Sequence, residues 1–412
     1  MKHRPKRIAV ALSMLTVLTL GTLIAGCGDE EVSPAPADTE ATASADDVVT
    51  ERDYPNKEMW WDGLPNMYSI VGINGSEGFD IASFVNTEMA EKLLALQYDT
   101  AVRYKDDLDP ELVAFWDGLG IKKELHDAED PTMAWATYTP VAALASDNTA
   151  KYPVVFSFHG NTNTILHAEG FGFPHLGATE GFITVIPDAD NSDGPTAAKM
   201  IPMILDTMEA EGYPIDRSRV YLTGMSKGGI CSAEAALALP DVVTAIAIHG
   251  SAFALETEPK SLREDLPPIG IPPAAYDDAM AYEIPLYLAV GEYDYGQIPI
   301  ASQSIIDGFN IWLEMNGCLT RLDLDECLTA SAEGEDPVAQ MLGVTADETY
   351  TETIDDSLHY FADYKDGEGV TMLRFIGIAN HPHWTTASYP QMAWDFMSRF
   401  SKDSEGLLTV TE

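Results

Sequence analysis

The sequence predicts an α/β fold in which a mostly parallel central sheet is flanked by helices. Short β-branched and aromatic runs alternate with stretches of helix-forming residues between residues 133 and 400, which is the pattern of βαβ units. Within this region a serine between glycines separates one predicted strand from the helix that follows it. An acidic residue and a histidine come soon after two later strands. These observations also direct the search for a functional site.

The start of the chain is typical of export rather than of a folded domain. Residues 1–7 are basic and residues 8–24 form an uncharged apolar run, so residues 1–26 are expected to be a bacterial signal peptide. Residues 23–27 read Leu-Ile-Ala-Gly-Cys and resemble a lipobox. This predicts an exported, extracytoplasmic chain that is anchored to the cell membrane through a lipidated Cys27. A plain signal peptide and an uncleaved membrane anchor are the alternatives.

The composition excludes some classes of partner. The chain has 23 basic and 66 acidic residues and a net charge of −43, which argues against binding nucleic acid or anionic polymers. No later segment is apolar and long enough to span a bilayer. Because an exported chain can hold disulfides, Cys318 and Cys327 are candidates for a bond that closes a small loop. Cys231 is then expected to be a buried free thiol.

Changes in composition divide the remaining chain. Residues 27–50 are rich in Ala, Asp, Glu, Ser, Thr and Pro, and they predict a disordered tether. Residues 51–120 are interpreted as an N-terminal extension, in which residues 88–98 form an amphipathic helix. Residues 121–403 are predicted to form the main α/β domain, and residues 404–412 a C-terminal tail.

The main domain is predicted to contain strands and helices in alternation. Residues 133–139 alternate in polarity, as expected for an antiparallel strand. Residues 319–350 are expected to form a segment that is inserted before the last strands. The other predicted strands are residues 154–158, 182–186, 220–223, 244–248, 285–290 and 372–376, and the helices are residues 196–212, 230–239, 303–316 and 389–400.

Residues 224–228 read Gly-Met-Ser-Lys-Gly and form the most informative motif. The motif lies between a predicted strand and a predicted helix, which is the context that a nucleophile elbow requires. Gly224 and Gly228 suit a turn too tight for larger side chains, and the turn exposes the Ser226 hydroxyl above the sheet. The sequence therefore predicts a serine hydrolase of the α/β-hydrolase fold with Ser226 as nucleophile.

A serine nucleophile needs a base, and the base needs an orienting carboxylate. In this fold the acid and then the histidine follow the serine along the chain, each after a strand. After the strand at 285–290 the acid is predicted to be Asp294, with Glu292 as the alternative. After the last strand two histidines compete, His381 and His383, and their spacing does not choose between them.

An oxyanion hole completes the predicted site. One donor is normally the backbone N–H of the residue after the nucleophile, here Lys227. The second comes from the loop after an earlier strand, where Gly160 permits a close turn and the amide of Asn161 is the candidate.

Metal and phosphate sites are not indicated. No His or Cys spacing suits zinc, and no glycine-rich phosphate loop is present. The acidic residues 188–194 lack the glutamate that a calcium loop requires at its end. No cofactor is expected.

Several segments together resemble the polyhydroxybutyrate depolymerase and feruloyl esterase group of secreted α/β-hydrolases. They are residues 154–160, 187–189, 220–229, 312–318 and 382–384. The doubled glycine after the elbow and the Asn-Gly-Cys after a helix are the more specific parts. The resemblance covers residues 133–400 in patches and implies an esterase.

The resemblance also bears on the choice of histidine. In the family pattern the base stands just after a proline, which implies His383 rather than His381. Two departures exist, because the acid loop lacks the family's histidine before Gly291 and the oxyanion loop has Asn161 where the family often has Cys.

These features predict a cell-surface carboxylic-ester hydrolase with a Ser226–His383–Asp294 triad. No separate polymer-binding module is visible, so a soluble short-chain or hydroxycinnamoyl ester, small or oligomeric, is expected as substrate rather than a solid polyester. A serine peptidase of the same fold and a non-enzymatic surface-binding lipoprotein are the alternatives.

Overall fold

The computed structural model describes most of the chain beyond residue 115. The described residues are 50–51, 116–126, 133–160, 165–187, 193–260, 269–292, 294, 296–354, 357–381, 383, 385–386 and 388–411. They belong to one compact unit, Val49–Glu412. The predicted signal peptide with Cys27, nearly all of the tether, most of the N-terminal extension and Asn161 lie outside the described residues.

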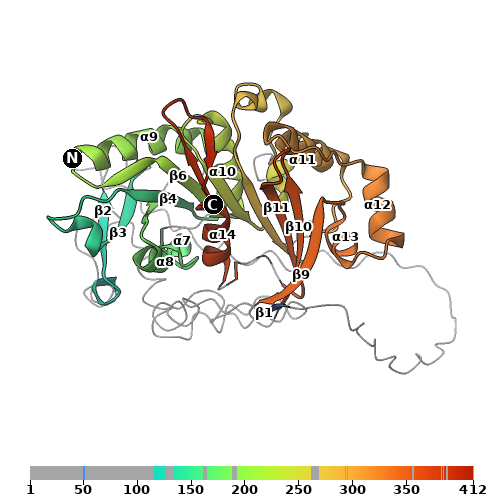
Figure 1. The fold of residues 1–412 in the computed structure, drawn as a ribbon, viewed down its shortest axis with the longest axis horizontal. Helices are drawn as coiled ribbons and strands as arrows, with labels where there is room; N and C mark the ends of the chain where they lie inside the picture. Colours follow the sequence, from blue (N-terminus) through green and yellow to red (C-terminus); the bar gives the residue numbers. More distant parts are fainter. Residues whose placement is uncertain are drawn as a thin grey trace, which may run out of the picture. The chain divides into compact units, whose positions relative to one another are not determined.

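A single mixed sheet organises the described residues (Figure 1). Its eleven strands lie in the order β1-β9-β10-β11-β8-β7-β6-β4-β5-β3-β2. The strands from β11 to β5 in this order are parallel to one another, and antiparallel pairs flank them on both sides. This confirms the predicted α/β-hydrolase fold with a mostly parallel central sheet. The strands are β1 (Thr50–Glu51), β2 (Ile121–His126), β3 (Trp135–Pro140), β4 (Tyr152–Phe158), β5 (Ile183–Pro187), β6 (Ile215–Met225), β7 (Ala245–His249), β8 (Leu286–Gly291), β9 (Glu348–Ile354), β10 (Ser357–Lys365) and β11 (Thr371–Ile378), with β12 (Phe400–Lys402) and β13 (Leu408–Val410) in a separate hairpin.

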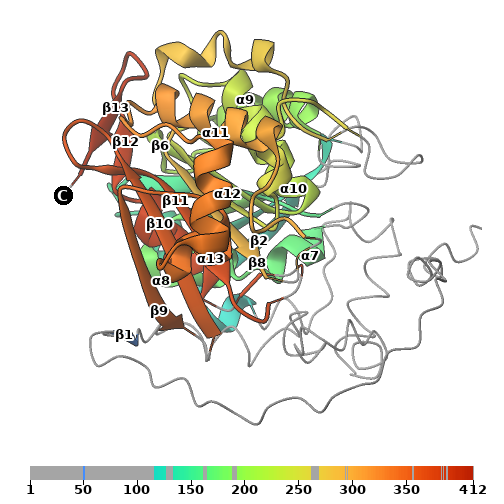
Figure 2. The same cartoon turned by 90° about the vertical axis from the view of Figure 1, so that its right-hand side faces the viewer.

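Helices cover both faces of the sheet (Figures 1 and 2). Helices α9 and α10 pack on one face, and α8 and α14 on the other. Among the described residues no helix has the length and apolar character needed to cross a bilayer. The helices are α7 (Ile165–Glu169), α8 (Phe173–Glu180), α9 (Gly194–Ala210), α10 (Lys227–Ala238), α11 (Gln303–Met315), α12 (Leu324–Glu333), α13 (Pro337–Leu342) and α14 (Tyr389–Met397), with 3-10 turns at Val141–Leu144, Ala252–Leu255, Pro273–Tyr276 and Ala279–Ala281.

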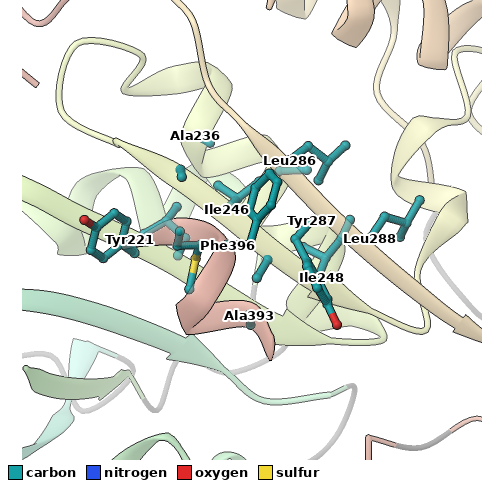
Figure 3. Packing of buried hydrophobic residues seen from close by; sticks show 14 of the residues in the cluster. Tyr221, Ala236, Ile246, Ile248, Leu286, Tyr287, Leu288, Ala393 and Phe396 are labelled. Atoms are coloured by element: carbon teal, nitrogen blue, oxygen red, sulfur yellow. The ribbon is translucent and has the colours of Figure 1, made fainter. Parts of the chain in front are cut away.

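The core lies between the central strands and these helices. Figure 3 shows Ala236 of α10 on one side of the strands and Ala393 and Phe396 of α14 on the other. The strand residues between them, such as Tyr221 and Tyr287, are almost completely buried. Strands covered on both faces must be apolar throughout, which explains the continuous hydrophobic runs of β6, β7 and β8.

The segment inserted before the last strands contains more regular secondary structure than predicted. Residues 319–350 hold helices α12 and α13 and the first residues of β9. Strands β9 and β10 then pair as an antiparallel hairpin, which the sequence analysis did not identify. Their mixed polar sequences, Glu-Thr-Tyr-Thr-Glu-Thr-Ile in β9 for example, suit an outer hairpin rather than a strand buried on both faces.

The C-terminal residues are not a simple tail. Within residues 404–412, strand β13 pairs with β12. The buried ammonium of Lys402 donates to the carbonyl oxygens of Pro240 (2.6 Å) and Gly406 (2.9 Å). Burial lowers the pKa of Lys402 to about 8. These contacts attach the C-terminal hairpin to the end of α10.

The predicted disulfide is absent from the structure. Cys318 and Cys327 are buried free thiols, as is Cys231. Closeness in sequence was not sufficient, because the Cys318 sulfur faces the carbonyl oxygen of Asn316 at 3.8 Å, whereas Cys327 lies within helix α12. Burial raises the pKa of both thiols, for Cys318 to about 12. The prediction that Cys231 is a buried free thiol is confirmed.

Candidate active site

Ser226 occupies a strained turn between β6 and α10. Its backbone has φ 58° and ψ −124°, a region that non-glycine residues rarely adopt and that costs about 1–3 kcal/mol. A Cβ atom at Gly224 would lie 2.3 Å from the carbonyl oxygen of Gly228. Only glycine therefore fits at position 224, and the structure has the elbow geometry that the motif predicts.

Backbone hydrogen bonds hold this turn. The Ser226 N–H donates to the carbonyl oxygen of His249 at 3.0 Å, and the Ser226 carbonyl accepts from the N–H of Gly229 at 2.9 Å. The Ser251 hydroxyl donates to the same carbonyl oxygen. The residues just after β7 thus support the nucleophile, while the half-buried Ser226 side chain is left on the outer side of the turn.

His383 and Asp294 meet at the carboxyl end of the parallel strands. Nδ1 of His383 lies 2.6 Å from Oδ1 of Asp294, which is fully buried, whereas the His383 side chain is 23% exposed. With Nδ1–H donated to the carboxylate, Nε2 is the nitrogen of a neutral imidazole that carries the basic lone pair. This is the tautomer that a general base requires.

Glu292, the alternative acid, has a different role. Its carboxylate accepts a hydrogen bond of 2.8 Å from the backbone N–H of Asn380. Asn380 has φ 53° and, with Ser226, is one of two non-glycine residues with positive φ in the described part of the chain. Glu292 therefore supports the turn that leads to His383, and Asp294 is the acid in contact with the imidazole.

His381, the alternative base, is buried rather than exposed at the site. Its ring contacts that of His249 edge to face, with centroids 6.0 Å apart, and His249 packs against Tyr389 in the same manner at 5.0 Å. Burial lowers the pKa of His249 to about 3, with smaller contributions from His383 and His359. His249 is therefore neutral at ordinary pH and lies at the end of β7, outside the Asp294–His383 pair.

The start of α10 packs closely against the end of β4. A Cβ atom at Gly228 would lie 2.1 Å from the carbonyl oxygen of Phe158 and 2.6 Å from that of His159. This approach brings the first turn of the helix beside the loop after β4, in which Nδ1 of His159 lies 2.8 Å from the Gly160 oxygen. The first N–H groups of a helix have no partner within it and favour negative charge. The Lys227 N–H is in this position, whereas Asn161 lies outside the described residues.

Sequence reasoning missed three residues that contact the site. Gly250 and Ser251 directly follow β7, and Gln297 follows Asp294 by three positions. The Gln297 side chain donates a hydrogen bond to the Asp294 carboxylate. No motif marks these positions, because contacts between loops from different strands depend on the sheet that brings them together.

The arrangement suits acyl transfer by a serine. It combines a half-buried serine hydroxyl on a strained turn, an imidazole oriented by a buried carboxylate, and a helix N-terminus beside the turn. Within the described ranges, no cluster of three or more His, Cys, Asp or Glu side chains is suited to hold a metal ion.

One curated relative matches part of the chain. It is poly(3-hydroxyalkanoate) depolymerase C of Paucimonas lemoignei, 31% identical in an alignment of 147 residues that covers 31% of this chain and 35% of the depolymerase. The chain thus spans about a third of the length of the curated relative it matches. The match confirms the resemblance inferred from the motifs. No protein-family model matches the chain.

Solved structures with a similar fold include two esterases. The acetyl xylan esterase from Aspergillus awamori has a TM-score of 0.44 and 12% identity, with 67% of this chain and 99% of the esterase covered. The S954A mutant of the feruloyl esterase module from Clostridium thermocellum, complexed with sinapinate, has a TM-score of 0.39 and 14% identity, with 67% and 86% covered.

Proposed function

We propose that this protein is a serine carboxylic-ester hydrolase with Ser226 as nucleophile, His383 as base and Asp294 as the acid that orients His383. The proposal depends on one observation above all, the 2.6 Å contact between the buried Asp294 carboxylate and Nδ1 of His383. The strained turn at Ser226 and the partial match to a depolymerase support it independently.

The reaction proceeds through an acyl-enzyme. His383 Nε2 accepts the Ser226 hydroxyl proton while Oγ attacks the ester carbonyl carbon, and the negative charge moves to the carbonyl oxygen. The Lys227 and Asn161 amides donate to that oxygen. The tetrahedral intermediate collapses, the C–O bond to the alcohol breaks, and His383 gives its proton to the leaving oxygen. In the second half, His383 takes a proton from a water molecule whose oxygen attacks the acyl carbon. The bond from that carbon to Ser226 Oγ then breaks, His383 returns the proton to Oγ, and the carboxylic acid leaves.

The substrate class follows from chemistry and charge. A chain with a net charge of −43 repels anions, so an uncharged ester approaches the site more readily than an anionic one. Soluble short-chain or hydroxycinnamoyl esters, small or oligomeric, are the proposed substrates. Export, with a lipid on Cys27 as membrane anchor, is proposed from the sequence and places such esters outside the cytoplasm.

Ser226→Ala tests the proposal. The variant is expected to lose at least about 1,000-fold in kcat/KM against the best of four p-nitrophenyl esters, acetyl, butyryl, hydroxybutyryl and feruloyl. Ser401→Ala, on strand β12, is the matched control and is expected to retain parental activity. Parental activity in Ser226→Ala would overturn the proposal.

A labelling experiment separates the alternative functions. The parental protein is expected to react with a fluorophosphonate probe, and Ser226→Ala is not. Labelling with cleavage of peptides but of no ester would indicate a peptidase. Failure to label together with failure to hydrolyse any ester would favour a non-enzymatic binding protein.

A further inference from the structure

Gln297 is an uncharged polar side chain buried next to the candidate triad. It lies in the loop after β8, three residues beyond Asp294, and is 3% exposed. Its own backbone N–H donates to the Asp294 carbonyl oxygen at 3.0 Å. A long amide buried at this point needs hydrogen-bond partners, because an unpaired buried polar group destabilises the folded state.

The Gln297 amide makes three hydrogen bonds. Nε2 donates to Oδ1 of Asp294 and, at 3.1 Å, to the carbonyl oxygen of Gly250. Oε1 accepts from the Ala252 N–H at 2.7 Å. Both amide protons and the amide oxygen are therefore used, so the orientation of the side chain is determined. The side chain joins the loop after β8 to the segment after β7.

That segment, Gly250 to Ala252, contacts every member of the triad. A Cβ atom at Gly250, where φ is +65°, would lie 2.9 Å from Oδ2 of Asp294 and 3.2 Å from Nδ1 of His383. Ser251 donates to the carbonyl oxygen of Ser226. Gln297 holds this segment from both sides, through Gly250 and Ala252, while it also holds the acid.

The carboxylate of Asp294 has few other supports. Oδ1 accepts hydrogen bonds from both Nδ1 of His383 and Nε2 of Gln297. Oδ2 is buried and has no hydrogen-bond donor among the described residues. Without Gln297 the carboxylate could rotate about its Cβ–Cγ bond, and among the described residues only the His383 side chain would still bond to it. Its orientation, and with it the tautomer of His383, therefore depends on Gln297.

We propose that Gln297 is a positioning residue that fixes the Asp294 carboxylate against His383 and ties it to the segment that supports Ser226. The proposal deepens the proposed function and depends on it. Gln297 acts through Asp294 and does not touch the reacting atoms. Its loss therefore reduces the fraction of enzyme in which His383 is correctly oriented, which lowers kcat, and leaves substrate binding unchanged.

Gln297→Ala tests the positioning role by separating kcat from KM. We expect kcat to fall about 10- to 100-fold, as for other residues that orient a functional side chain, and KM to change less than twofold. The control is Asn316→Ala, which removes another fully buried amide, one that donates to the Trp312 carbonyl oxygen at 2.9 Å. This variant is expected to lose stability with kcat retained. Equal kcat values in Gln297→Ala and the parent would overturn the proposal.

Gln297→Glu adds a pH readout that general destabilisation would not produce. An ionised glutamate cannot donate to Asp294 and places a second negative charge beside it, whereas a protonated one can donate. The kcat of Gln297→Glu relative to Gln297→Ala is therefore expected to increase as the pH is lowered. A ratio independent of pH would contradict the role assigned to the Nε2 donor.

A spectroscopic measurement is independent of any substrate. The His383 Nδ1 proton, bonded to a buried carboxylate, should give a low-field ¹H resonance in the parent that is lost in His383→Gln. In Gln297→Ala we expect it to shift or broaden, and an unchanged resonance would overturn the proposal. If the parent hydrolyses no ester but shows this behaviour, the proposed function fails while the positioning role stands.

Discussion

Two buried carboxylates, Asp294 in the loop after β8 and Asp363 on β10, are held in contrasting ways. Both are almost inaccessible, at 0% and 2% exposed. Asp363 on β10 stands directly opposite Arg374 on β11, and the guanidinium donates to both carboxylate oxygens, at 2.7 and 2.6 Å. Asp294 lies in a loop, and its partner is an imidazole from a second loop. The register of two neighbouring strands brings Asp363 and Arg374 together, whereas two loops bring Asp294 and His383 together.

The difference separates a carboxylate that stabilises from one that can serve catalysis. Burial alone would lower the pKa of Arg374, but the hydrogen bonds and charge of Asp363 raise it well above its usual range, so the guanidinium keeps its charge. The partner of Asp294 is an imidazole, a side chain that can accept a proton at one ring nitrogen while the other nitrogen bonds to a carboxylate. A fixed ion pair would resist the proton transfer that the proposed reaction requires, whereas an Asp–His pair permits it.

The largest expected effect is that of Asp294→Asn on catalysis. The amide can present its NH₂ group to His383 and favour the wrong tautomer, so kcat should fall by about 1,000- to 10,000-fold, with modest change in the free energy of unfolding. Ester hydrolysis and urea denaturation measure the two quantities. Glu292→Gln is the matched control, because the new amide oxygen can still accept from the Asn380 N–H, and its kcat should stay within a few-fold of the parent. A larger loss in Glu292→Gln than in Asp294→Asn would reverse the assignment of the acid.

Asp363→Asn is expected to lower the stability and to leave kcat unchanged, the reverse of the effect of Asp294→Asn. It leaves the Arg374 guanidinium largely buried without a counter-charge, which should lower the free energy of unfolding by about 3 kcal/mol. The kcat of the folded fraction should remain parental, because Asp363 lies on β10 of the outer hairpin and bonds to Arg374 rather than to a member of the candidate triad. Denaturation curves and active-site titration with a fluorophosphonate test this. A fall in kcat per labelled site would show that the two carboxylates are coupled.

A smaller effect concerns the neutral His249 beside the site. Its pKa is lowered to about 3 by burial, so below its ordinary value of 6.5 the unfolded chain binds a proton that the folded chain does not. Parental stability should therefore fall with decreasing pH, by at most about 1.4 kcal/mol per unit between roughly pH 6 and pH 3 from this residue. The His249→Phe variant has no imidazole at this position, so this part of the decrease in stability with falling pH should be absent from it.

Urea denaturation of the parent and His249→Phe between pH 8 and pH 4 measures this contribution. The difference in the free energy of unfolding between the two should be constant above about pH 7 and should change in favour of the variant as the pH falls. A constant difference over the whole range would mean that His249 takes up a proton equally in both states.

The local sequence determined the elements that carry the candidate site. The glycine-flanked Ser226 between an apolar strand and a helix is a local pattern, and its strained turn was predictable because only small neighbours fit there. The parallel strands were predictable because strands buried on both faces must be continuously apolar. Asp294 was preferred to Glu292 from its distance beyond the strand, and the structure places it against His383.

Other features depended on contacts between distant segments. The β9–β10 hairpin was missed because its polar sequence gives no strong periodic signal. Cys318 and Cys327 are close in sequence, yet both are free thiols in the structure. No sequence motif marks Gln297 either, because an amide three residues after an acid is common. Its role becomes visible only in the folded protein, where another loop places Gly250 and Ala252 beside it.

By itself the sequence determined the fold class and the strained serine and reduced the candidate acid and the candidate base to two residues each, because these follow from backbone geometry, hydrophobic pattern and chain order. The family resemblance then implied His383. The tertiary structure alone decided which side chains hold the acid in place and which buried carboxylate is fixed by an arginine. The physical reason is that orientation within a site depends on short-range hydrogen bonds between loops. The sheet brings those loops together, and no local sequence pattern indicates which loops will be neighbours.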